Sequence, residues 1–209
     1  MRELFRCMKA EVIKMRHTFL YPVHSVPPVL GSGIFLLYYR VSGGSDAAQI
    51  SGYMEVVGIA LPFVISMICA ENVELESKNH FQVFLGGAGC RFNAFLAKYL
   101  VLAGIGFMAV LAAVMLFAAG FQWGLAKKGI LFHAYGKLAV ILCLGSAPLY
   151  LEHLFLNLMF SKPVSLCAGI VEFLLSALFL TGLGDGRWYF FPCTWSARGA
   201  AAYLAVLFV

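Results

Sequence analysis

Hydrophobic residues in this chain gather into long runs that are separated by short polar stretches. A helix that crosses a bilayer needs about 20 mostly apolar residues, and most of these runs approach or exceed that length. Three prolines in the first run predict a helix that is kinked or unwound in its first half. The pattern predicts an all-α integral membrane protein with six transmembrane helices, at residues 19–39, 52–70, 93–120, 135–160, 164–183 and 197–209.

Residues 1–17 have a different pattern, in which apolar and basic positions share a helical period. Leu4, Met8, Val12 and Met15 recur with helical spacing, and Lys and Arg side chains occupy the remaining arc. A helix of this kind lies in the headgroup plane of a membrane, with its apolar side toward the acyl chains. The alternative is a positively charged flank that only orients the first span. We favour an N-terminal interfacial amphipathic helix.

The composition agrees with a membrane protein and argues against most soluble classes. Hydrophobic residues make up 62% of the chain and charged residues 12%, whereas a soluble domain is roughly half apolar and a quarter charged. Such a chain is a poor candidate for a soluble enzyme, a nucleic-acid-binding protein or a secreted disulfide scaffold. Its six cysteines have neither C-x-x-C nor zinc-ligand spacing, so no metal site is predicted. We expect residues 1–209 to form a single transmembrane domain.

The distribution of Lys and Arg predicts how the chain is oriented, because positive residues concentrate in cytoplasmic loops. With the N-terminus in the cytoplasm, nine of these residues lie inside and six outside. The five basic residues before the first span decide the orientation, since the first helix usually dominates. Lys127 and Lys128 are the main evidence against it. We therefore expect a multi-pass protein with a cytoplasmic N-terminus.

The last hydrophobic run, residues 197–209, is short for a span. Its thirteen residues make about 20 Å of helix, whereas the hydrocarbon core is about 30 Å thick. The helix starts earlier, or is only half inserted, or the sequence is truncated. We favour truncation.

The longest charged stretch, residues 71–91, lies between the second and third spans. A bare connection needs only a few residues, but this segment also carries an apolar group near its centre. It suits docking into a groove on a soluble partner, with its carboxylates pairing to basic residues at the rim. The alternative is a solvated loop whose apolar residues dip into the membrane surface. The candidate docking residues are Glu71, Glu74, Glu76, His80, Phe81, Gln82 and Arg91.

Three ionisable residues lie inside the predicted spans: Glu152 and His153 in the fourth, and Glu172 in the fifth. Each glutamate is ten residues from Lys162 in the connecting turn, so a helical hairpin places both at about 15 Å from the turn. Ionisable residues inside a membrane are costly and tend to face partners or water-filled cavities. One hypothesis is a polar site on a substrate path. The other, slightly favoured, is a hydrogen-bonded cluster that locks the hairpin, and a metal site is a remote third.

Motifs for enzymatic chemistry are missing from the sequence. There is no G-x-x-x-x-G-K-[ST] phosphate-binding loop, so the chain cannot hydrolyse ATP by that route. It also has no H-E-x-x-H motif and no G-x-S-x-G motif. We therefore predict no catalytic residues and no bound cofactor.

Taken together, these features resemble the permease subunits of ABC-2 type ABC transporters. The shared features are the interfacial helix, the six spans, the acidic segment between the second and third spans, and Lys98 at the start of the third. Residues 4–18 are similar to the start of the small lantibiotic-immunity permeases, and residues 181–195 are similar to the outer loop of their MutG-like branch. The resemblance covers essentially the whole chain. The acidic segment matches that branch at Glu74, Glu76 and residues 80–82.

The resemblance implies a role in self-immunity. Such permeases pair with a second, related permease and with ATP-binding subunits, and together they expel lantibiotic peptide from the producer's membrane. It implies a transporter subunit of the bacterial cytoplasmic membrane rather than an enzyme, with ATP bound by the partner subunit. Asp185, Trp188 and Tyr189 in the outer loop would then meet the peptide, although these aromatic residues suit interfacial anchors equally well. The alternatives are another cargo (a drug, a lipid or a polysaccharide precursor) or, less favoured, an intramembrane enzyme built on Glu152, His153 and Glu172.

Overall fold

A computed structural model describes residues 2–15, 18, 20–78, 81 and 91–208 of the chain. These residues form seven α-helices and no strand. A π-helical turn (Gly120–Gly124) extends α5, and two 3-10 turns (Gly182–Gly184 and Trp188–Phe190) lie between α7 and α8. The α-helices are α1 (Arg2–Met15), α2 (Leu20–Val41), α3 (Asp46–Lys78), α5 (Arg91–Ala119), α6 (Phe132–Met159), α7 (Lys162–Leu180) and α8 (Pro192–Leu207).

Four of these helices, α3, α5, α6 and α7, are long and apolar enough to cross a membrane. This confirms the coarse prediction of an all-α membrane protein. In the described part of the chain, α2 and α8 fall outside that set of four. The α8 helix has 16 residues, which corresponds to about 24 Å and is shorter than the hydrocarbon core.

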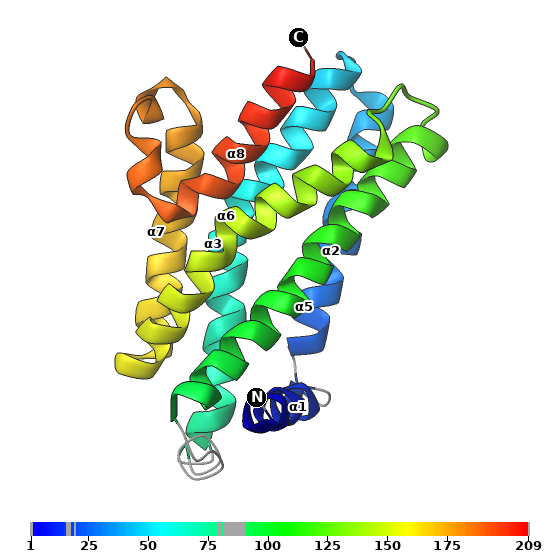
Figure 1. Cartoon of the computed structure of the whole chain (residues 1–209). Helices are drawn as coiled ribbons and strands as arrows, with labels where there is room; N and C mark the ends of the chain where they lie inside the picture. The colour runs from blue at the N-terminus through cyan, green and yellow to red at the C-terminus, as the bar shows by residue number, and fades with distance from the viewer. Residues whose placement is uncertain (1, 16–17, 19, 79–80, 82–90, 209) are drawn as a thin grey trace.

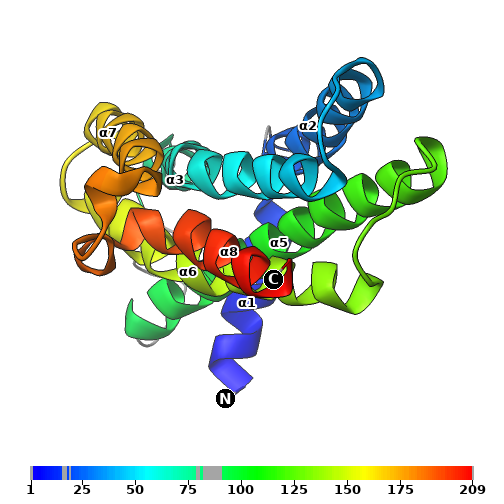
Figure 2. The ribbon, with the colours of Figure 1, turned by 90° about the horizontal axis from the view of Figure 1, so that it is seen from above.

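The helices form a tilted bundle with α1 lying across one end (Figure 1). Seen from above, α2 and α7 stand on opposite flanks of this bundle (Figure 2). Helix α3 packs against α6, α7 and α8, whereas α5 packs against α1, α2 and α6. The core includes the contact between α3 and α5, where the rings of Tyr53 and Phe117 stack with their centroids 3.9 Å apart.

Helix α3 is longer than the sequence pattern indicated. Its 33 residues reach about 50 Å, well beyond the thickness of a hydrocarbon core. We expected the second span to end near Ala70 and a charged connection to follow. The helix instead continues to Lys78, because residues 71–78 include no glycine or proline and several good helix formers. The three glutamates of this stretch therefore lie on helical turns rather than in a loop.

For helix α2 we expected a first half that is kinked or unwound. The backbone is α-helical from Leu20 to Val41, with Pro27 and Pro28 inside it, so the first half is not unwound. Proline lacks the N–H group that would bond to a carbonyl one turn earlier. The side chain of Ser32 adds a local bond, because its hydroxyl donates to the carbonyl oxygen of Pro28 at 2.7 Å.

Helix α8 runs in the same direction as α7 and does not return to the α1 end. Near its start, the backbone of Ser196 lies against Gly145 in the middle of α6, whereas Leu207 lies beside Phe132, where α6 begins. Helices α6 and α8 are therefore antiparallel, and both α7 and α8 finish at the end opposite α1 (Figure 1). The chain between α7 and α8 turns back to mid-bundle before α8 starts. In the described residues, α8 thus begins earlier than the expected sixth span and does not cross the bundle.

Candidate functional site

Helix α1 has one face on the bundle and one face outside it. Glu11 and Met15 are buried against the bundle, whereas Phe5, Val12 and Ile13 are exposed. The exposed basic side chains of this helix lie beside its exposed apolar ones. This arrangement suits a helix that rests on the bundle from one side and on a membrane surface from the other.

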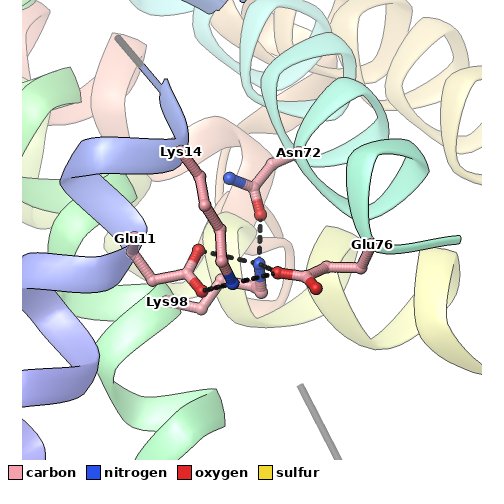
Figure 3. Close-up of polar contacts among 5 residues, drawn as sticks. All are labelled: Glu11, Lys14, Asn72, Glu76 and Lys98. Carbon is pink, nitrogen blue, oxygen red and sulfur yellow. Dashed lines mark hydrogen bonds and ion pairs between the residues drawn. The ribbon is translucent and has the colours of Figure 1, made fainter. Parts of the chain in front are cut away.

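Beneath α1, five polar side chains from three helices meet in what we call the ion cluster (Figure 3). The ammonium of Lys98 donates to Glu11 at 2.9 Å, to Glu76 at 3.2 Å and to Asn72 at 2.6 Å. The ammonium of Lys14 donates to Glu11 at 2.8 Å and to Glu76 at 2.6 Å. The members are Glu11 and Lys14 of α1, Asn72 and Glu76 of α3, and Lys98 of α5.

The ion cluster is deeply buried and electrically balanced. The exposed fraction is 1% for the Lys98 side chain, 3% for Glu76 and 7% for Glu11, and only Lys14 reaches 27%. Buried charges are tolerated when they are paired and hydrogen bonded. Two carboxylates and two ammonium groups meet that condition, since each ammonium contacts both carboxylates.

Hydrogen bonds to two carboxylates keep the Lys14 ammonium protonated. Burial by itself lowers the pKa of this ammonium, but its hydrogen bonds to Glu11 and Glu76 outweigh the burial and raise the pKa above the ordinary value of 10.5. Lys14 therefore stays protonated at neutral pH. Fixed pairs of opposite charge suit a mechanical joint: α1, α3 and α5 cannot separate without exposing or stranding a buried charge.

The acidic residues expected to face a partner contact lysines of this chain. The ammonium of Lys162, at the turn between α6 and α7, contacts Glu71 at 2.5 Å and Glu74 at 2.6 Å. Glu74 also pairs with Lys78 at 3.2 Å, and Glu76 lies in the ion cluster. The α6–α7 turn is thereby tied to the same end of α3 as α1.

The other candidate docking residues are spread over the connection that follows α3. Phe81 is half-buried and packs against the core, whereas Arg91 is exposed at the start of α5. His80 and Gln82 lie outside the described residues. We use the name α3–α5 surface for the exposed side chains among the last two described residues of α3 and the first two of α5. They are Ser77, Lys78, Arg91 and Phe92.

The ionisable residues of the predicted spans lie in a polar cluster between α6 and α7. His153 is fully buried, with Nε2 at 3.0 Å from a carboxylate oxygen of Glu172 and Nδ1 at 3.1 Å from the hydroxyl of Ser165. The side-chain amide of Asn157 donates to the same hydroxyl at 2.7 Å. Glu152, the preceding residue of α6, is exposed and lies close to the carboxyl group of Glu172. The structure thus brings His153 and Glu172 together, and no group of three or more His, Cys, Asp or Glu among the described residues is arranged to hold a metal ion.

The outer loop is organised by an arginine that the sequence did not single out. Arg198 of α8 donates from Nε to the carbonyl of Phe179 at 2.5 Å and from Nη2 to the carbonyl of Thr181 at 2.7 Å. Its Nη2 also contacts Asp185 at 2.9 Å. The guanidinium therefore satisfies carbonyl groups at the end of α7. Of the predicted outer-loop residues, Asp185 takes part in this contact.

The two aromatic residues predicted in this loop have different surroundings. Trp188 is half-buried and its carbonyl accepts a bond from the hydroxyl of Thr194 at 2.7 Å. Tyr189 is exposed, and its carbonyl accepts a bond from the indole of Trp195 at 3.0 Å. These bonds involve the backbone of the loop and leave the Tyr189 ring on the surface.

The sequence did not reveal the main members of the ion cluster. From the sequence, Lys14 is one of the basic residues on the arc of the N-terminal helix, and neither Glu11 nor Asn72 is singled out. One signal was available: Glu11 is an acid near the buried face of a mostly basic helix, three residues before Lys14. That pattern marks a local pair but does not identify its distant partners.

Comparison with known proteins adds no family or relative. No protein-family model matches this chain, no curated protein matches it, and no solved structure matches it.

Proposed function

We propose that this chain is the permease subunit of an ABC-2 type ABC transporter in a bacterial cytoplasmic membrane. In this proposal it pairs with a second permease subunit and with an ATP-binding subunit, and it expels a lantibiotic or a similar antimicrobial peptide. The observation that carries the proposal is the ion cluster, which joins the interfacial helix α1 to the ends of α3 and α5. When ATP hydrolysis on a separate subunit moves the helices of a permease, those helices need a firm contact with one another near the place where that subunit binds.

The α3–α5 surface is the proposed contact for the ATP-binding subunit. Helix α3 packs closely along α7, and Glu71 and Glu74 contact Lys162 at the start of α7, so a displacement at this end moves α3 together with the α6–α7 turn. The ion cluster couples the same displacement to α1. In this proposal the partner subunit binds and hydrolyses ATP, and the helices of this chain transmit the resulting movement.

The exposed side chains of this surface favour a particular kind of partner groove. Lys78 and Arg91 are exposed cations and Phe92 is an exposed aromatic residue. A groove with an apolar floor and an acidic rim on the ATP-binding subunit would complement them. The carboxylates that we expected to make this contact also pair with lysines of this chain, and the side chains of Glu71 and Glu74 remain partly exposed.

Six spans are proposed for this permease, with α2 as the first. Its outer side exposes Val29, Ile34 and Leu37, which is suited to contact with lipid. The N-terminus is proposed to be cytoplasmic, which places Lys127 on the outer side. There the ammonium of Lys127 donates to the Tyr39 carbonyl at 3.1 Å and to the Gln49 side chain at 2.5 Å, so hydrogen bonds within the protein account for a lysine on that side.

Co-purification with the ATP-binding subunit tests the proposed contact. Phe92→Asp and Arg91→Glu should abolish co-purification of that subunit and its stimulated ATP hydrolysis, because both changes oppose an apolar, acidic groove. Lys128→Glu, at the opposite end of the bundle, is the matched control and should leave both unchanged. Unaltered assembly in the Phe92 and Arg91 variants would contradict the proposed contact.

Cell-based measurements test the cargo. Cells that carry the permease and its partners should survive higher lantibiotic concentrations than cells without the permease. An equal sensitivity to lantibiotic, together with a changed sensitivity to a drug or a changed envelope lipid or polysaccharide, would assign another cargo.

A further inference from the structure

A long apolar groove lies between α2, α3 and α5, away from the ion cluster. Its volume is about 310 Å³. Small and aliphatic side chains form most of the wall, and Tyr53, Tyr150 and His24 contribute its polar atoms. The residues that matter for the argument are Pro27 and Gly31 of α2, Val56 and Ala60 of α3, and Ala109 and Ala113 of α5.

The groove is narrow for its length. On α3 the lining runs from Tyr53 to Ile68, and at 1.5 Å per residue this stretch is about 22 Å long. A volume of about 310 Å³ spread over that length leaves room for one hydrocarbon chain. A helix with its side chains is about 10–12 Å across and does not fit.

The groove opens toward the bilayer. Val56 of α3 is 43% exposed, and Pro27 of α2 is exposed as well, so the open side lies between these two helices. Helices α3 and α5 are long and apolar enough to cross a membrane. When α3 and α5 cross a bilayer, the opening between α2 and α3 faces lipid.

The wall offers little to a polar ligand, because its polar side chains are those of Tyr53, Tyr150 and the buried His24. The hydroxyl of Tyr53 already donates to the carbonyl of Ala113 at 3.0 Å, and the hydroxyl of Tyr150 is packed against Gly106. Apolar cavities do not hold water well, and an empty groove loses the dispersion contacts of its lining atoms. Within a bilayer no hydrophobic driving force separates lipid tails from apolar side chains, so close packing decides what fills the space.

We propose that this groove holds one acyl chain of a membrane phospholipid, which fills the space between α2, α3 and α5. The bound chain acts as a packing element that supports α2 against α3, where these two helices are separated by the groove. The proposal goes beyond the transport function and does not depend on it.

Two glycines of α2 provide a matched pair of variants. A Cβ atom at Gly31 or at Gly33 meets no other atom within 4 Å, so a side chain can leave the backbone without a clash at both positions. Gly31 lines the groove, whereas Gly33 is not among its lining residues. Gly31→Phe fills the groove with a ring, and Gly33→Phe adds the same ring to the same helix elsewhere.

The experiment uses the full chain in vesicles of phosphatidylethanolamine and phosphatidylglycerol that contain a phospholipid with a photoreactive acyl chain. After illumination, labelled residues are mapped by mass spectrometry. We expect labelling of groove residues such as Ala60 and Ala109 in the unchanged protein and in Gly33→Phe, and loss of this labelling in Gly31→Phe. Labelling of the exposed residue Leu144 of α6 should be the same in all three.

Two results would overturn the proposal. One is undiminished groove labelling in Gly31→Phe, and the other is an unlabelled groove in the unchanged protein while Leu144 is labelled. The second result would also be obtained if a second copy of this chain covered the groove. If Gly31→Phe does not fold, Ala60→Phe fills the groove from α3 and is subject to the same criteria. Failure of the acyl-chain proposal does not bear on the proposed contact with the ATP-binding subunit, because the labelling experiment contains no such subunit.

Discussion

Replacing Lys98 by methionine should release α1 from the bundle. Methionine keeps a long unbranched side chain but removes the cation that lies between the carboxylates of Glu11 and Glu76. It also removes the donor 2.6 Å from the Asn72 side-chain oxygen. The ion cluster then carries one net negative charge, and Lys14 is its only cation.

The size of the effect follows from burial. Breaking a buried ion pair by removing one partner costs about 3–5 kcal/mol, because the remaining charge stays away from water. The Lys98 side chain is 1% exposed and its two carboxylate partners are nearly as buried, so Lys98→Met belongs in this range. The Lys14 side chain is 27% exposed, and Lys14→Met should cost only about 1 kcal/mol because water can reach the site.

A cysteine on the buried face of α1 can report the release. Met15 is 2% exposed, so a thiol introduced by Met15→Cys reacts with maleimide only when α1 leaves the bundle. About 1.4 kcal/mol corresponds to a tenfold change in an equilibrium. Lys98→Met should therefore raise the labelling rate at position 15 by roughly two to four orders of magnitude, and Lys14→Met by about tenfold or less.

A compensating substitution separates the charge effect from lost packing. Adding Glu76→Gln to Lys98→Met returns the ion cluster to neutrality, so labelling should fall back toward the unchanged protein. Similar labelling rates in Lys98→Met and Lys14→Met would refute the argument from burial. Additive effects in the double variant would show that the charges of Lys98 and Glu76 are not coupled.

Three further predictions concern packing and surface contacts. Lys162→Ala should lower the free energy of unfolding by less than about 1 kcal/mol, because this lysine side chain is 39% exposed, and the loss should shrink in high salt; a large, salt-independent loss in thermal denaturation would contradict this. Gly58→Ala should lower the free energy of unfolding by about 1–3 kcal/mol, since its Cβ would lie 2.6 Å from the α8 backbone. Gly104→Ala, whose Cβ points into open space, should be neutral or slightly stabilising, and equal thermal midpoints for the two variants would be the contrary result. Arg198→Ala should lower the free energy of unfolding by about 1–3 kcal/mol and expose the outer loop to protease, because it removes the donors to two carbonyls. Asp185→Asn should have little effect, since the Asp185 side chain is 71% exposed. Equal proteolysis of both variants would argue against the role given to Arg198.

The sequence by itself determined the class of this protein and the location of its helices. Long apolar runs and scarce charges require burial in lipid whatever the tertiary arrangement, so the membrane class and the helices α3, α5, α6 and α7 could be predicted. The amphipathic character of α1 is equally local. The approach of His153 to Glu172 also followed from the chain, because the turn at Lys162 brings the two helices into one hairpin.

Only the tertiary structure decided which charges are available to a partner. Glu76 resembles its acidic neighbours in the sequence, yet it is 62 residues from Lys14 and 22 from Lys98 along the chain and lies between them in space. The direction of α8 depends likewise on Gly58 and Gly145, where the absence of a side chain lets the α8 backbone come close. Hydropathy and helix propensity act over a few turns, so the helices could be predicted from the sequence. Ion pairing and close packing depend on which distant surfaces meet, so the ion cluster and the direction of α8 could not.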